Sequence, residues 1–172
     1  MSSLNKNTFF KISLLYLPVT ILFFSVFNEF DLNYLKIEYF SFDFVYILIF
    51  YWTLKNPNLL GYVSIFFAGI INDIVTGLPM GVSSLSYLLI CVATAYIRNI
   101  TLRPHFIQDW ISFLITILVI NSFQILILDF IFLFKLDYTI YFLSLGFTFI
   151  LYPLFFFMFN FINPKKIIKE ND

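Results

Sequence analysis

The chain has 172 residues, zero formal net charge, 61% hydrophobic residues and only 12% charged residues. A soluble domain carries roughly 25% charged residues, because it needs a polar shell against water. With a mean hydropathy of +0.93, the composition excludes an ordinary water-soluble domain and predicts that the lipid bilayer is the solvent. The zero net charge provides no bulk attraction to nucleic acid, so no nucleic-acid partner is expected.

Six apolar runs follow one another and predict an all-α integral membrane protein with six spanning helices. Their approximate limits are Phe9–Phe27, Tyr39–Leu54, Leu59–Val75, Val82–Ile97, Trp110–Phe134 and Tyr138–Ile162. A spanning helix needs about 20 residues, so the second and fourth runs are short. No internal repeat or long linker divides the chain, and residues 1–172 are expected to form one membrane domain. The first run lacks a convincing cleavage site, which favours an uncleaved span.

Four polar breaks and the placement of basic residues predict the topology. The breaks are Lys55–Asn58, which contains Pro57, the glycine-rich Thr76–Gly81, the charged Arg98–Asp109, and Lys135–Asp137. If the N-terminus is cytoplasmic, eight basic residues lie inside and only Lys36 and Lys135 lie outside. The eight are Lys6, Lys11, Lys55, Arg98, Arg103, Lys165, Lys166 and Lys169. This asymmetry follows the positive-inside rule and predicts that both termini are cytoplasmic.

Asp73 lies in the last turn of the third predicted helix, where the negative end of the helix dipole disfavours a carboxylate. The tight turn that follows brings back the start of the fourth helix, whose free amides provide hydrogen bonds for such a group. The structural interpretation is therefore that these amides bind Asp73. A residue that contacts a partner and a protonatable site are the functional alternatives.

Three more polar residues lie in the fifth run. Asn121 and Gln124 are three apart and share one helix face, whereas Asp129 points about 140° away from Gln124. We interpret them as interhelical hydrogen-bonding groups plus a carboxylate near the interface. A proton or ion path would need more aligned acids than this run supplies.

Small residues predict close packing of helices. Gly61 and Gly69 are eight apart, hence on one helix face, and with Ala68 they would allow close approach of a neighbouring helix. Ala93, Thr94 and Ala95 would do the same on the fourth predicted helix. Ser83, Ser84 and Ser86 follow Gly81 and are expected to begin the fourth helix, with hydroxyls that cap free amides.

The single cysteine and single histidine give no metal-site pattern. Cys91 lies in an apolar run and cannot form an intramolecular disulfide, so we expect a small buried side chain. His105 lies in a polar break without the neighbours that a zinc site needs. No phosphate-binding loop, Ser-x-x-Lys or His-Glu-x-x-His motif is present. No cofactor, metal or catalytic activity is therefore expected.

The stretch from Tyr51-Trp52 through Pro57 and Gly61 to Gly69-Ile70-Ile71-Asn72-Asp73 and Gly77-Leu78-Pro79-Met80-Gly81 resembles the rod shape-determining protein MreD family. The signature covers about thirty residues and is carried by Gly69, Asp73, Gly77, Pro79 and Gly81, with Tyr87 a weaker match. Elsewhere the likeness is one of hydropathy, length and number of spans. The Phe-rich spans depart from the pattern of the family, so the resemblance assigns no role to residues outside the signature.

The resemblance implies a non-enzymatic component of the cell-elongation machinery in the bacterial inner membrane. The family is known as a partner of MreC, which has one span and an extracytoplasmic coiled coil. It works with MreB, the RodA glycosyltransferase and a class B penicillin-binding protein, and its fold resembles the six-span vitamin-binding subunits of energy-coupling-factor transporters. A vitamin-type binding subunit of a transporter is therefore the alternative. It has few candidate polar residues for a binding pocket, namely Asp73, Asn72, Asp129 and the first outer-loop acids Glu29, Asp31 and Glu38.

Overall fold

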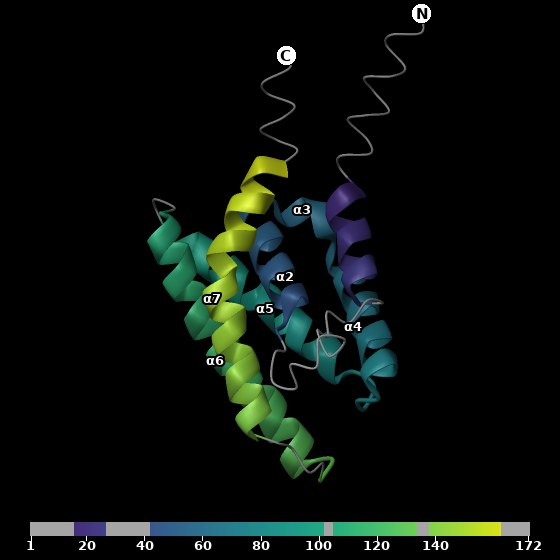
Figure 1. The fold of residues 1–172 in the computed structure, drawn as a ribbon. Helices are drawn as coiled ribbons and strands as arrows, with labels where there is room; N and C mark the ends of the chain where they lie inside the picture. The colour runs from purple at the N-terminus through teal and green to yellow at the C-terminus, as the bar shows by residue number, and fades with distance from the viewer. Residues whose placement is uncertain (1–15, 27–41, 102–104, 134–137, 163–172) are drawn as a thin grey trace, which may run out of the picture.

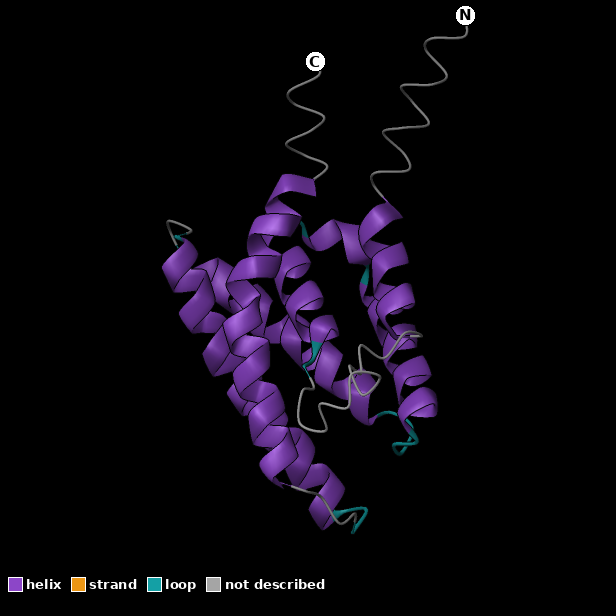
Figure 2. Cartoon of the chain, viewed as in Figure 1, coloured by secondary structure: helices purple, strands orange, loops and turns teal. Residues whose placement is uncertain are grey.

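The computed structural model describes residues 16–26, 42–101, 105–133 and 138–162, and every regular element in these ranges is a helix (Figure 2). An N-terminal helix, Tyr16–Val26, comes first. The others are α2 Phe44–Lys55, α3 Pro57–Leu60, α4 Tyr62–Thr76, α5 Val82–Ile100, α6 Phe106–Phe130 and α7 Tyr138–Ile162. The all-helical architecture that the composition predicts is confirmed for this part of the chain.

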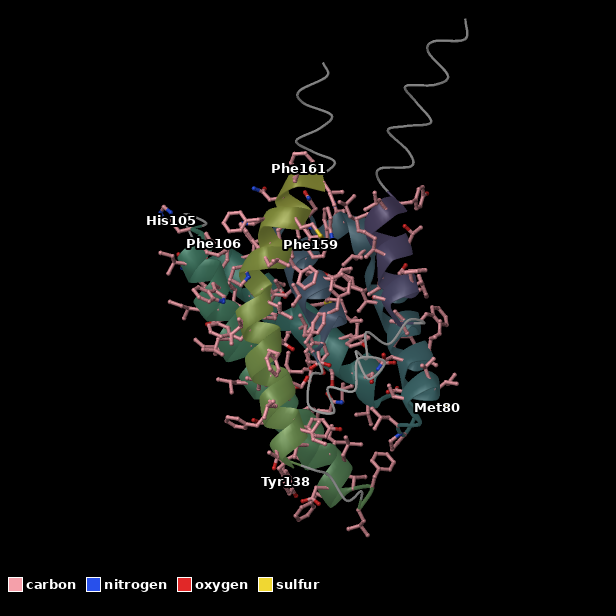
Figure 3. All side chains as sticks on the ribbon, in the orientation of Figure 1. Met80, His105, Phe106, Tyr138, Phe159 and Phe161 are labelled. Carbon is pink, nitrogen blue, oxygen red and sulfur yellow. The ribbon has the colours of Figure 1, made fainter. Side chains whose placement is uncertain are left out.

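The helices form an antiparallel bundle in which long neighbours along the chain run in opposite directions (Figure 1). The N-terminal helix begins and α7 ends at the end of the bundle that holds His105 and Phe161, whereas Met80 and Tyr138 lie at the other (Figure 3). We call these the His105 end and the Met80 end. The short α3 lies at the His105 end, between α2 and α4 (Figure 1).

Helix α2 is the centre of the bundle. Every residue from Phe44 to Leu54 is buried, and α2 packs against α5 and α7. A helix that is hydrophobic on all sides must be buried all round, which explains its position. Its 12 residues rise about 18 Å, whereas the hydrocarbon core of a bilayer is about 30 Å thick. α2 is thus shorter than a bilayer-spanning helix. It also begins later than the predicted run Tyr39–Leu54, because Phe42 and Asp43 are not helical.

The predicted run Leu59–Val75 is not one helix. Gly61 has φ +66°, in the left-handed region that glycine adopts without strain, and it separates α3 from α4. Pro57 stands in the first turn of α3, where its missing amide donor costs nothing. The prediction that Gly61 and Gly69 share one helix face is consequently wrong, because no single helix contains both.

The later helices differ from the predicted runs mainly at their ends. α5 continues to Ile100 rather than Ile97, and α7 matches the predicted limits Tyr138–Ile162. α6 begins at Phe106, four residues before the predicted Trp110, because residues 106–109, which include the polar Gln108 and Asp109, form its first turn. It ends at Phe130, and Leu133 has a positive φ of +51°. Residues 9–15, 27, 39–41 and 134 of the predicted runs lie outside the described residues.

Helices α6 and α7 are the two described helices long and apolar enough to cross a membrane. Their outward faces are apolar. Exposed examples are Ile111, Ile115, Val119 and Leu126 on α6, and Phe142, Ile150, Leu154 and Phe157 on α7. Such a surface is unfavourable in water and favourable in lipid, so the fold is compatible with a helical membrane protein.

Candidate functional site at the turn between α4 and α5

The carboxylate of Asp73 lies against the first residues of α5. Its Oδ2 accepts a hydrogen bond from the backbone amide of Gly81 at 2.7 Å, and its Oδ1 accepts one from the amide of Ser83 at 2.8 Å. These amides have no partner within α5 because they belong to its N-terminal turn. The predicted contact between Asp73 and the start of the next helix is therefore present.

The turn that returns the chain to Asp73 depends on two glycines. Gly77 ends α4 with φ +69°, and its amide donates to the carbonyl of Asp73. The amide of Leu78 donates to the same carbonyl at 2.9 Å. Gly81 precedes α5 with φ +101°. Both glycines have a backbone conformation that would be strained in a residue with a side chain. The turn also contains a hydrogen bond from the amide of Val82 to the carbonyl of Pro79, at 3.3 Å.

Gly69 allows α4 and α5 to touch. A Cβ added at this position would lie 2.3 Å from the Cα of Ser84. The hydroxyl of Ser84 donates to the carbonyl of Phe66 at 3.1 Å, one turn earlier on α4, and Ala68 is fully buried. The prediction of close approach is confirmed at Gly69. On α5, Thr94 is buried whereas Ala93 and Ala95 are partly buried.

The serines that follow Gly81 do begin α5, but the prediction that their hydroxyls cap it is wrong. The N-cap residue is Gly81, which has no side chain, and the Asp73 carboxylate occupies the amides instead. The Ser83 hydroxyl accepts from the Asn72 side chain at 3.1 Å. Ser83 and Ser84 therefore join α5 to α4 through their side chains.

A second polar group lies in the centre of the bundle. Gln124 Oε1 accepts from the Tyr46 hydroxyl at 2.6 Å and from the Ser86 hydroxyl at 3.3 Å, so it joins α6 to α2 and α5. Asn121 is buried on the same face, whereas Asp129 is exposed. The predicted division of these three residues between two directions, and the interhelical role of Gln124, are confirmed.

Sequence reasoning missed an ion pair near the His105 end. Lys55 at the end of α2 lies 2.7 Å from Asp109 on α6, whose side chain is 2% exposed, and it also lies over the ring of Phe156. Arg98 donates to the carbonyl of Thr53 at 3.3 Å. Lys55 and Asp109 stand in breaks predicted to lie on the same side of the membrane, and this was the signal that could have suggested the pair.

Asp43 was also missed, although it is an acid inside the second predicted run. Its backbone amide donates to Thr148 Oγ1 at 2.9 Å, and the Ser144 hydroxyl donates to its Oδ2 at 3.3 Å. These bonds join the start of α2 to α7. An acid directly before a long apolar run was the available signal, but its partners are about a hundred residues away.

The remaining candidates are not gathered into a site. Cys91 is buried 3.9 Å from the Thr53 hydroxyl, and His105 is exposed before α6. Within the four described ranges, no three residues of the metal-binding types lie together. A search of protein-family models, curated proteins and solved structures finds no match to the chain.

The Asp73 site is a closed clamp. The side chain is 0% exposed, and each carboxylate oxygen has an amide donor. A partner has no access to these atoms, so any effect of Asp73 on a partner must pass through the shape of the turn. What the arrangement exposes is the turn itself, including Met80, which is 75% exposed.

Proposed function

We propose that the chain is a non-enzymatic inner-membrane component of the bacterial cell-elongation complex, similar to MreD. In this role it binds an MreC-like single-span protein and helps to organise peptidoglycan synthesis by RodA and a class B penicillin-binding protein alongside MreB. The observation that carries the proposal is the Asp73 clamp. Asp73, Gly77 and Gly81 shape one turn, and Gly69 lets the two helices that this turn connects pack closely, so these signature residues serve a single structural unit.

In this proposal Asp73 is a positioning residue and the turn is the part that meets the partner. Ile74, Val75 and Met80 are exposed apolar side chains on or next to the turn. The clamp fixes the position of these side chains relative to α4 and α5, because Asp73 binds the end of α4 to the beginning of α5. A preformed surface loses less conformational entropy on binding than a flexible one.

The proposed topology has six spans with both ends in the cytoplasm. It is supported by the antiparallel order of the helices and by the position of Lys55, which ends α2 beside the short α3 at the His105 end (Figure 1). The Met80 end then faces the extracytoplasmic side, where an MreC-like partner has its main domain. The His105 end then faces the cytoplasm, the side on which the sequence predicts an excess of basic residues.

Co-purification tests the proposal. The tagged chain, extracted from bacterial membranes in mild detergent, should retain an MreC homologue. The Asp73→Lys variant should insert into the membrane but lose that partner, whereas the Asp129→Lys variant should keep it, since Asp129 is exposed and outside the clamp. A chain that never retains the MreC homologue, and instead carries a tightly bound vitamin, would support the transporter-subunit alternative.

A further inference from the structure

The helices that the structure describes differ greatly in length. α6 and α7 contain 25 residues each, whereas α4 contains 15. At 1.5 Å per residue these lengths are about 37 Å and about 22 Å. The hydrocarbon core of a typical bilayer is about 30 Å thick. α4 is therefore about 8 Å too short for such a bilayer, while α6 and α7 are longer than it.

Irregular backbone prevents α4 from being extended at either end. Gly61, before its first residue, is exposed and has a positive φ. Gly77, after its last residue, is also exposed with a positive φ and leads into the non-helical turn to Gly81. Lipid-exposed irregular backbone does not occur within the hydrocarbon region, because lipid offers it no hydrogen bonds. The hydrocarbon beside α4 must consequently end close to both ends of this helix.

The outward face of α4 is apolar along its length. Val63 near its start, Phe67 in its middle and Val75 near its end are all exposed. Matching exposed residues near the ends of α6 are Ile107 and Phe130. Both helices therefore present apolar surface to the lipid, but over different heights. In agreement with this, Tyr138 at the start of α7 lies farther from the His105 end than Met80 does (Figure 3).

Tilting the whole bundle does not remove the difference. Packed helices that share a tilt are shortened along the bilayer normal by the same factor, so 15 residues still cover three-fifths of the height of 25. A tilt that fits α6 and α7 to the bilayer shortens α4 further. Snorkelling of long flanking side chains is another way to accommodate a short helix, but neither the break at Gly61 nor the turn from Gly77 to Gly81 contains a lysine or arginine. For one copy of the chain, a change in the thickness of the lipid around the protein therefore fits α4 best.

We propose that the chain thins the bilayer on its α4 side relative to its α6–α7 side, so that its α4 surface selects short or readily compressed acyl chains. The inference rests on the proposed membrane-spanning role. The occupant of the α4 face is lipid: the height of the apolar surface between Gly61 and Gly77 sets the acyl-chain length that fits it. Beside α4 the hydrocarbon is about 8 Å thinner than in the surrounding bilayer.

Depth-dependent fluorescence quenching tests this directly. Single cysteines are placed by Val63→Cys and Val75→Cys on α4, and by the matched Ile107→Cys and Phe130→Cys on α6, in full-length protein with Cys91→Ser. Each is labelled and reconstituted into vesicles of medium-chain monounsaturated phosphatidylcholine that carry quenchers at known depths. Thinning places the α4 labels about 2 Å below the hydrocarbon edge, whereas an undeformed bilayer places them about 6 Å below it.

The outcomes separate the thinning from the membrane role. Shallow labels on both α4 and α6 support the inference, as does an unchanged depth of the α4 labels when short-chain lipid replaces medium-chain lipid. Deep α4 labels beside shallow α6 labels overturn the thinning and leave the membrane-spanning role intact. If lipid-borne quenchers reach none of the four labels, the spanning role fails and the inference fails with it.

Discussion

Asp73 illustrates how one buried carboxylate organises a turn. Replacing it by Asn leaves one oxygen to accept hydrogen bonds where two now accept from Gly81 and Ser83. One helix amide then loses its partner, which costs about 1–3 kcal/mol for a buried group. We expect Asp73→Asn to lower the thermal unfolding midpoint of the purified protein in detergent. The matched variant Asp129→Asn should leave it unchanged, and equal stability of the two variants would contradict the clamp.

Gly69 provides a second prediction at the residue scale. The Cβ of Gly69→Ala would meet the backbone of Ser84 at 2.3 Å, so α4 and α5 must separate or shift. Overpacking of this kind costs about 1–3 kcal/mol. Gly146→Ala is the control, because nothing lies within 4 Å of its added Cβ on α7 and alanine favours a helix over glycine. Thermal unfolding in detergent should show loss at Gly69 only; equal effects would mean that the helices do not touch there.

At the scale of elements, the ion pair between Lys55 and Asp109 holds the end of α2 to α6. Its two side chains differ in exposure to solvent: Lys55 is 26% exposed and Asp109 is 2% exposed. Removing one partner of a buried pair leaves an uncompensated charge and costs about 3–5 kcal/mol, a figure that the partial exposure of Lys55 reduces. We therefore expect Lys55→Met to destabilise the protein measurably.

The double variant Lys55→Met with Asp109→Leu separates the pair from the loss of either side chain. It removes both charges together, so it should recover much of the stability lost in Lys55→Met alone. Unfolding in detergent, followed for both single variants and the double variant, gives the interaction energy. Additive losses would show that the pair contributes nothing to the attachment of α2.

For the whole molecule, the antiparallel bundle predicts that Met80 and His105 lie on opposite sides of the membrane (Figure 3). In a Cys91→Ser background, a membrane-impermeant thiol reagent should label Met80→Cys in intact cells. His105→Cys should react only after permeabilisation, because its end is expected to be cytoplasmic. Labelling of both from outside would reject the six-span arrangement.

Much of the candidate site was predictable because its contacts are local in sequence. Asp73 lies eight and ten residues from its two amide donors, and a turn that contains Gly77, Pro79 and Gly81 leaves few ways to connect two helices. The unpredicted features involve longer separations. Lys55 and Asp109 are 54 residues apart, and Ser144 and Asp43 are 101 apart, so only the packing of whole helices brings them together.

For the part of the chain that the structure describes, composition and periodic breaks by themselves determined a helical fold with an apolar exterior, and the turn chemistry determined where α4 must end. Only the tertiary structure decided that α2 is central, that Gly61 separates two helices and that polar groups attach both ends of α2 to its neighbours. The physical reason is that the tendency of an apolar run to be removed from water is a property of its own residues. Whether the run is then surrounded by lipid or by the protein interior depends on which other helices pack against it.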